Sequence, residues 1–262
     1  MINVKNLTKK FGELTAVDNI SFEVNDGEIF AFLGPNGAGK TTTINMFTTL
    51  LPPTDGTAVI NGYDSVRQPE EVRRSFGIVF QDLSLDDDLT AFENMELHGV
   101  LYDVPDEVRK TRIEELLRLV DLWDRKDRLV KEFSGGMKRR LEIARVFLHR
   151  PKILFLDEPT LGLDPQTRLF LWSNVKELSK TEGVTIFFTT HYMEEAERIA
   201  QRIAIIDDGK IVAIGTSDDL KKQTNASTLE DAFLSLTGKT IREESSNTTE
   251  RKKSGHGPWR HL

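Results

Sequence analysis

The sequence predicts a mixed α/β fold, with a mostly parallel sheet and flanking helices. Strand-like and helical segments alternate from about residue 153 onward, short strands and turns fill the first sixty residues, and a helical block lies between these two parts. We expect one domain over residues 1–237, with an N-terminal antiparallel β subdomain and an α-helical subdomain inserted at about residues 82–150.

Composition narrows the class of protein. Of the 262 residues, 38% are hydrophobic and 29% are charged, and no apolar run approaches the roughly 18–20 residues of a membrane-spanning helix. The chain has no cysteine, which excludes disulfides and thiolate metal sites. Its net charge of −7 argues against a nucleic-acid partner, because phosphate contacts need clustered Lys and Arg. We expect a globular protein of the cytosol.

The first half of the chain holds short strands around one glycine-rich turn. Alternating or buried apolar patterns predict strands at Ile2–Val4, Thr15–Val24, Glu28–Leu33, Thr57–Ile60 and Ile78–Phe80. Helical periodicity follows the glycine-rich turn at Thr41–Leu50. The strand–turn–helix order is typical of an α/β core.

The second half begins with the helical block and ends in regular alternation. Helices are expected at Pro105–Leu119 and from Ser134 to Leu148. After them come strands at Ile153–Leu156, Val184–Thr190, Ile203–Ile206 and Lys210–Ile214, separated by helices at Gln166–Ser179 and Met193–Ala200. Residues 238–262 form a polar tail that we expect to be disordered.

The glycine-rich turn has the pattern G-x-x-x-x-G-K-[ST], and its residues are Gly34, Pro35, Asn36, Gly37, Ala38, Gly39, Lys40 and Thr41. Such a loop turns backbone N–H groups and a helix N-terminus toward phosphate oxygens, which predicts a P-loop NTPase core. We expect Lys40 to reach the β- and γ-phosphates, Thr41 to help hold Mg²⁺, and Thr42 to contact the α-phosphate. The alternative is a chance match, which the strand–loop–helix context disfavours.

Two acids end the buried strand Ile153–Leu156. Asp157 stands where P-loop enzymes coordinate Mg²⁺, and Glu158 is expected to polarise the water that attacks the γ-phosphate. His191 follows another buried strand and can contact the γ-phosphate and orient the water. Gln81 ends a short strand, and its amide oxygen can touch Mg²⁺ or the water. Taken singly, the acids could cap a strand, and the histidine and glutamine could be ordinary surface residues.

Over residues 1–237 the sequence resembles the ABC transporter ATPase family. Phe133-Ser134-Gly135-Gly136-Met137 resembles the family's signature motif, usually written LSGGQ. The resemblance implies that Ser134, Gly135 and Gly136 bind the γ-phosphate of an ATP held by a second subunit, in a head-to-tail homodimer. It also implies that Phe11 stacks on adenine, and that Leu161-Gly162-Leu163-Asp164 communicates across the dimer. Met137 replaces the usual glutamine and Phe11 the more frequent tyrosine, and we expect function to survive both changes.

Within this family, the run SGGMKRR and the segment Leu229–Leu234 resemble the ABC-2-type exporters of drugs, lipids or polysaccharides. The second segment could also be a simple packing helix. The resemblance implies an ATP- and Mg²⁺-dependent ATPase on the cytoplasmic face of the membrane, bound to a separate permease whose coupling helix docks around Asp82–Val104. The acidic run Asp86-Asp87-Asp88 could touch that permease or be a solvated loop.

Three other functions share this ATP chemistry. A nucleic-acid ATPase would carry long heptad insertions or DNA-binding lobes, and a translation-factor ATPase normally has two cassettes in one chain. Neither feature occurs here. An importer ATPase is the nearest alternative, although many importers add a regulatory β-domain that this sequence lacks. We expect the permease to recognise the cargo, so this sequence does not identify it.

Overall fold

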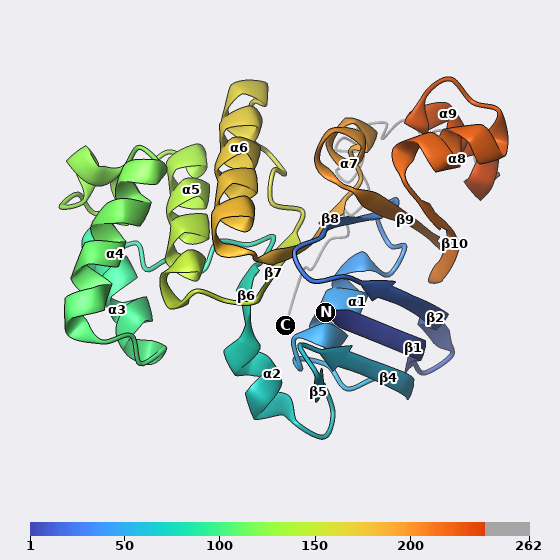
Figure 1. Cartoon of the computed structure of the whole chain (residues 1–262), viewed down its shortest axis with the longest axis horizontal. Coiled ribbons are helices and arrows are strands. Elements are labelled where there is room, and N and C mark those ends of the chain that lie inside the picture. Colours follow the sequence, from blue (N-terminus) through green and yellow to red (C-terminus); the bar gives the residue numbers. More distant parts are fainter. Residues whose placement is uncertain (239–262) are drawn as a thin grey trace, which may run out of the picture.

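The computed structural model, which describes residues 1–238, contains two sheets and a block of helices (Figure 1). The smaller sheet is antiparallel in the order β2-β1-β4-β5, with β1 at Ile2–Phe11, β2 at Leu14–Val24, β4 at Asp55–Ile60 and β5 at Tyr63–Asp64. The larger sheet has the order β10-β9-β3-β8-β7-β6, and all its pairs are parallel except β10 with β9. The predicted α/β class is confirmed.

The strands of the larger sheet are β3 (Ile29–Leu33), β6 (Phe76–Val79), β7 (Ile153–Asp157), β8 (Thr185–Thr190), β9 (Arg202–Asp207) and β10 (Lys210–Gly215). The helices of the N-terminal and inserted parts are α1 (Lys40–Phe47), α2 (Pro69–Ser75), α3 (Ala91–Leu101), α4 (Asp106–Leu119) and α5 (Gly135–Val146), with 3-10 turns η1 (Trp123–Arg125), η2 (Val130–Glu132) and η3 (Phe147–His149). The remaining helices are α6 (Pro165–Glu182), α7 (Met193–Ile199), α8 (Ser217–Thr224) and α9 (Leu229–Thr237).

A cluster of phenylalanine rings joins the two sheets beneath α1. Phe22 of β2 stacks on Phe30 of β3 with ring centroids 5.6 Å apart, and Phe187 of β8 lies 5.8 Å from Phe30. Phe47 at the end of α1 meets the edge of the Phe187 ring at 5.5 Å and is fully buried. Each fully buried ring contributes about 1.5–3 kcal/mol, so this cluster anchors α1 and the loop that precedes it.

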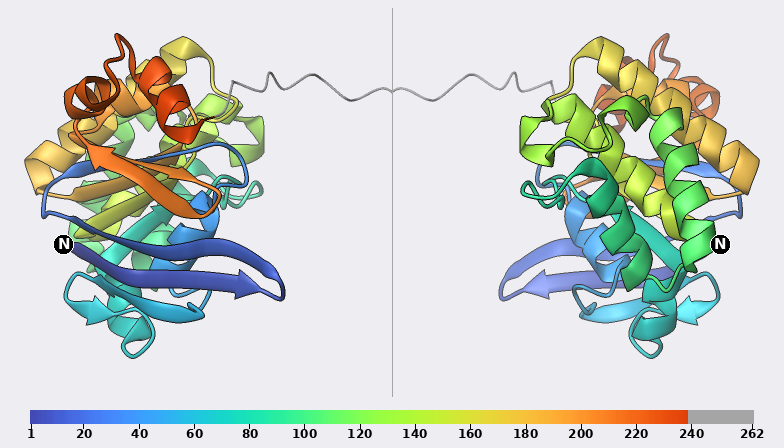
Figure 2. Two further views of the ribbon diagram at one scale, coloured as in Figure 1. Left: turned by 90° about the vertical axis from the view of Figure 1, so that its right-hand side faces the viewer. Right: turned by 90° about the vertical axis from the view of Figure 1, so that its left-hand side faces the viewer.

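The helical block lies in the chain between β6 and β7, which are neighbours in the larger sheet. Figure 1 shows α3, α4 and α5 side by side on the flank of the sheet away from β1 and β2. The apolar interior of the block is continuous with the core on one face of the larger sheet, and α4 contributes Ile113, Leu116 and Leu117 to it. The helices α8 and α9 lie at the opposite end of the molecule from β4 and β5 (Figure 2).

Several elements differ from the sequence expectations. β1 continues to Phe11 rather than ending at Val4, because it pairs with β2 along its whole length. The first helix ends at Phe47 rather than Leu50. Helices α2, α3 and α8 were not predicted. The structure does not describe residues 239–262, so the predicted disordered tail lies outside the described residues except for Gly238. Within residues 1–238, no helix is both long and apolar enough to cross a membrane.

Candidate nucleotide-binding and hydrolysis site

The glycine-rich turn connects β3 to α1, and two of its glycines are required by close backbone approaches. Gly39 has a φ of 101°, and a Cβ there would lie 2.5 Å from the carbonyl oxygen of Ala16 in β2. A Cβ on Gly34 would lie 2.4 Å from the carbonyl oxygen of Ile206 in β9. The neighbouring strands therefore exclude side chains at both positions and fix the path of the loop.

Lys40 begins α1, and its side chain is 5% exposed. Its Nζ donates to the carbonyl oxygens of Gly34 (2.8 Å) and Pro35 (3.0 Å). It also lies 3.0 Å from Oε1 of Glu158. The ammonium group is thus held inside the loop by three oxygens, at the point where a phosphate would enter.

Glu158 follows the last residue of β7, in a left-handed conformation with a φ of 47°. Its Oε2 lies 2.9 Å from Nδ1 of His191, while Oε1 faces Lys40. Burial acts to raise the pKa of this carboxyl. The hydrogen bond with His191 and the charge of Lys40 outweigh burial and lower the pKa to about 2. The carboxylate is therefore ionised at neutral pH and is a weak base while both partners hold it.

Asp157 is the last residue of β7 and is 1% exposed. Burial raises its pKa, and hydrogen bonds with Thr189 and Thr41 act in the opposite direction. The Thr189 hydroxyl donates to Oδ1 of Asp157 at 2.5 Å. The interaction with Thr41 brings together the two oxygen-bearing side chains that the sequence predicted as Mg²⁺ ligands.

One pocket of about 590 Å³ gathers most of the predicted site residues. The predicted residues that line it are Phe11, Asn36, Gly37, Gly39, Lys40, Thr41, Thr42, Gln81, Glu158 and His191. Gly34, Pro35 and Ala38 belong to the same loop, and Asp157 lies behind it at the end of β7. Phe11 is 47% exposed, and the Lys9 ammonium lies 5.2 Å from the centre of its ring. Leu14, Ala16 and Tyr192 also line the pocket and were not predicted.

Gln81 is connected to the inserted helices by a residue that the sequence analysis missed. Arg139 of α5 is 4% exposed and donates to the carbonyl oxygens of Phe80 (2.5 Å) and Gln81 (2.7 Å). A further hydrogen bond of 2.8 Å with Glu142 fixes the guanidinium group. A movement of α5 would therefore be transmitted directly to the backbone at Gln81.

His191 is supported by a stack of side chains that also was not predicted. The Tyr192 ring lies 4.1 Å from the His191 ring, and the Arg168 guanidinium lies 4.3 Å from the centre of the Tyr192 ring. Arg168 belongs to α6, and it also donates to the carbonyl oxygen of Leu163 at 2.9 Å. The stack ties the histidine to the start of α6.

The structure does not bring Ser134, Gly135 and Gly136 to the pocket that contains Lys40. Ser134 caps α5 by accepting from the backbone N–H of Met137 at 3.3 Å. Ser134 and Gly136 line a separate pocket of about 260 Å³, together with Thr167 of α6. A Cβ on Gly136 would lie 2.9 Å from the Thr167 methyl carbon, so this glycine allows the two helix starts to pack closely.

Comparisons with known proteins agree with one another. The family model described as ABC transporter matches residues 17–161. The linearmycin resistance ATP-binding protein of Bacillus subtilis is 42% identical over 229 residues, covering 87% of this chain and 73% of that protein. The daunorubicin/doxorubicin resistance ATP-binding protein of Streptomyces peucetius is 42% identical, with 87% and 69% covered. The Nod factor export ATP-binding protein I of Cupriavidus metallidurans is 39% identical, with 84% and 72% covered.

Two solved structures are similar over nearly their whole length. The structure of an ATP-binding subunit of an ABC transporter has a TM-score of 0.82 and 32% identity, covering 90% of this chain and 99% of that one. A dimeric ATP-binding cassette in a post-hydrolysis state with ADP and phosphate has a TM-score of 0.74 and 30% identity, covering 82% and 98%.

Proposed function

This chain belongs to the ABC transporter family, and we propose that two copies of it hydrolyse ATP at a shared head-to-tail interface. The hydrolysis would drive a separate ABC-2-type permease. The chain is an ATP-binding and ATP-hydrolysing subunit of the export type. The similar proteins are named for drug resistance and Nod factor export, so the importer interpretation is not favoured.

The separation of the two phosphate-binding motifs carries the proposal. Lys40 and Ser134 line different pockets of the same chain, so one chain cannot place both against one phosphate. Two copies related by a two-fold axis would bring each Ser134 onto the other copy's ATP, closing two sites at once. A dimer would then form when ATP binds and open when the γ-phosphate leaves.

The residues present fit a Mg²⁺ ion whose coordination shell is completed by the nucleotide. Among residues 1–238, no group of three His, Asp or Glu side chains could hold a metal by itself. Mg²⁺ in such sites takes one or two protein oxygens and completes its shell with phosphate oxygens and water. Thr41 and Asp157, with Gln81 at the pocket edge, would supply the protein oxygens. The ion would neutralise charge on the phosphates.

A change of partner by Lys40 would link ATP binding to the basicity of Glu158. In the structure, Lys40 lies 3.0 Å from the Glu158 carboxylate and helps to hold its pKa near 2. A γ-phosphate would draw the Lys40 ammonium away from that carboxylate. Glu158 would then become a stronger base and accept a proton from the attacking water, while His191 keeps its hydrogen bond and orients the carboxylate.

A variant that binds ATP without hydrolysing it tests the dimer. Glu158→Gln keeps the size of the side chain but cannot accept the proton, so ATP binding should persist and hydrolysis should fall at least 100-fold. With ATP and Mg²⁺, the variant should elute at twice the monomer mass in size-exclusion chromatography with light scattering. Glu107→Gln, at an exposed site on α4, is the matched control and should behave as the wild type.

Ser134→Arg, added to Glu158→Gln, distinguishes the head-to-tail dimer from other associations. The arginine side chain would block the second phosphate site, so cross-linking of the ATP-dependent dimer should be lost while the monomer stays folded. If Glu158→Gln forms no dimer by cross-linking at high protein and ATP concentrations, or if Ser134→Arg leaves the dimer intact, the proposed interface is wrong.

A further inference from the structure

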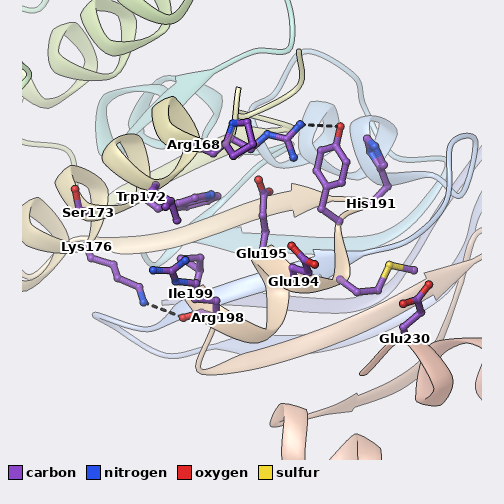
Figure 3. A pocket seen from close by; sticks show the side chains of 14 residues that line it. Arg168, Trp172, Ser173, Lys176, His191, Glu194, Glu195, Arg198, Ile199 and Glu230 are labelled. Carbon is purple, nitrogen blue, oxygen red and sulfur yellow. Dashed lines mark hydrogen bonds between the residues drawn. The ribbon is translucent and has the colours of Figure 1, made fainter. Parts of the chain in front are cut away.

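A second pocket of about 590 Å³ lies between α6, α7 and the first turn of α9 (Figure 3). The residues that line it are Pro165, Arg168, Leu169, Trp172, Ser173, Lys176, His191, Tyr192, Met193, Glu194, Glu195, Arg198, Ile199 and Glu230. We call it the α6–α7 groove. The hydrolysis chemistry uses none of it except His191, which stands with Tyr192 in the wall between the groove and the nucleotide pocket.

The floor of the α6–α7 groove is apolar and holds a hydrogen-bond donor without an acceptor. Leu169 is 49% exposed, whereas Trp172 and Ile199 are buried at its base. The Nε1–H of Trp172 has no hydrogen-bond partner within residues 1–238. A buried donor of this kind normally finds an acceptor, and the carbonyl oxygen of an entering peptide would supply one after a small shift of the ring.

The rim of the α6–α7 groove carries unpaired acids near α9. Glu194 and Glu230 are exposed, and in the described part of the chain neither carboxylate has an ion-pair or hydrogen-bond partner. Figure 3 shows both of them on the side of α9, with Lys176 and Arg198 at the other end of the groove. Lys176 already donates to the carbonyl oxygen of Arg198 at 2.9 Å. The acidic end favours a cationic occupant.

We propose that residues 251–262 of the same chain bind in the α6–α7 groove. Their sequence, RKKSGHGPWRHL, supplies cations for Glu194 and Glu230 and the apolar side chains of Trp259 and Leu262 for the floor. Residues 239–262 contain six Lys or Arg and three Glu, in a chain with a net charge of −7. The charge of the segment is therefore complementary to the acidic end of the groove, formed by Glu194 and Glu230.

The position of α9 makes this intramolecular contact possible. Glu230 lies in the first turn of α9, and the tail follows directly after Gly238, at the end of the same helix. Because an α-helix rises only about 1.5 Å per residue, Gly238 is close to Glu230. The twelve residues between Gly238 and Arg251 can span roughly 40 Å when extended, so the segment can reach the groove. A tether of this kind gives an effective concentration on the order of 1 mM, so weak contacts suffice for binding.

Binding in the α6–α7 groove would affect hydrolysis through the wall that the groove shares with the nucleotide pocket. His191 and Tyr192 face both pockets, and Arg168 fixes Tyr192 from the groove side. A bound segment would restrain Arg168 and Tyr192 and so oppose any rearrangement of this wall during turnover. This regulatory part rests on the proposed function, whereas the binding of the segment does not.

The lack of cysteine in the chain allows a direct test in the full-length protein. Ser173→Cys in the groove wall and His261→Cys in the tail should form an intrachain disulfide under mild oxidation. Lys222→Cys with His261→Cys is the matched control, because α8 packs on α9 but Lys222 lies outside the groove. The Ser173 pair should close at least tenfold faster than the control pair, and Glu194→Gln with Glu230→Gln, or Trp259→Ala, should remove that advantage.

The outcomes separate the possible occupants. Equal rates for the Ser173 and Lys222 pairs would overturn the proposal, and a disulfide-linked dimer would show that a second copy fills the groove instead. ATPase activity of the oxidised Ser173 pair should fall at least threefold and recover on reduction. If it does not fall, the regulatory part is wrong. If the reduced protein has no ATPase activity at all, the proposed function fails and the disulfide rates still decide on the binding.

Discussion

Glu158 illustrates what single residues contribute and how far the sequence predicts them. Its place after a buried apolar strand was enough to predict a carboxylate at the sheet edge. The sequence could not predict that Lys40, 118 positions earlier, and His191, 33 positions later, hold that carboxylate at 3.0 and 2.9 Å. These contacts arise from the pairing of β3 with β8 and of β8 with β7, which no local pattern specifies. The left-handed backbone at Glu158 costs of order 1–3 kcal/mol.

The residues that the sequence analysis missed share a physical cause. Leu14, Ala16 and Arg168 carry no motif, whereas Arg139 and Tyr192 lie within or beside motif segments that do not specify their contacts. All five contacts depend on packing between elements of the folded chain. The motif residues, in contrast, were predictable because a phosphate loop needs glycines and a lysine at fixed spacing. Their roles in catalysis and metal binding remain predictions.

Lys40 gives a sharp prediction at this scale. Lys40→Ala removes the ammonium group that lies inside the phosphate loop, and among the residues that line this pocket there is no other lysine or arginine. ATPase activity should fall at least 100-fold, and the affinity for a fluorescent ATP analogue should weaken. Lys110→Ala, at an exposed position on α4, should leave both within twofold. Substantial hydrolysis by a folded Lys40→Ala protein would contradict the assignment.

At the scale of elements, helix ends and strand pairing explain most of the differences. α3 begins with a capping box in which Thr90 accepts from the N–H of Glu93, and α8 begins with the same motif at Thr216 and Asp219. Both signals are visible in the sequence, so these two helices were predictable from their caps. The length of β1 was not, because its second half pairs with β2 through register shifts that depend on the partner strand.

A half-buried histidine cluster connects the inserted helices to the sheet. His98 of α3 lies 3.3 Å from His149 of η3, and Tyr102 stacks on His149 with ring centroids 3.9 Å apart. Nε2 of His149 lies 3.3 Å from the carbonyl oxygen of Phe76 in β6. Burial lowers the pKa of His149 to about 4, and burial with the nearby charges of Arg145 and His149 lowers the pKa of His98 to about 3.

This cluster predicts acid-dependent unfolding. Below pH 6.5 the unfolded chain binds protons at both histidines while the folded chain does not, so the free energy of unfolding should decrease as pH falls from about 6.5 to 4. The slope is about 1.4 kcal/mol per pH unit for each histidine. His149→Gln should remove one histidine's share of the slope in urea unfolding at pH 7, 6 and 5, and Tyr102→Phe should keep the full slope. If the free energy of unfolding depends on pH with the same slope in the wild type and in His149→Gln, His149 is not a source of the acid-dependent unfolding.

At the scale of the whole molecule, the acidic run beside the inserted helices has partners within the chain. Asp87 pairs with Lys138 of α5 at 2.6 Å, and Asp88 pairs with Lys131 at 3.1 Å. Reversing these charges would therefore disturb the chain's own loop, and any loss of permease binding would be ambiguous. Exposed apolar side chains on α3 offer a cleaner probe. Leu97, Val100 and Leu101 are 48%, 53% and 70% exposed, and their spacing places them on one helix face.

We expect this exposed apolar face of α3 to be the contact surface for the proposed permease. It belongs to the segment that follows Gln81, and Arg139 ties the backbone at Gln81 to α5, so a permease helix bound there would sense movements of the helical block. We expect the tagged chain to recover a multi-spanning membrane protein from detergent-solubilised native membranes. Leu97→Asp with Leu101→Asp should reduce that recovery at least fivefold while ATPase activity stays within twofold. Leu50→Asp, at a site 62% exposed just after α1, should change neither. Recovery of only soluble or ribosomal proteins across several detergents would refute the permease and leave the ATP chemistry intact.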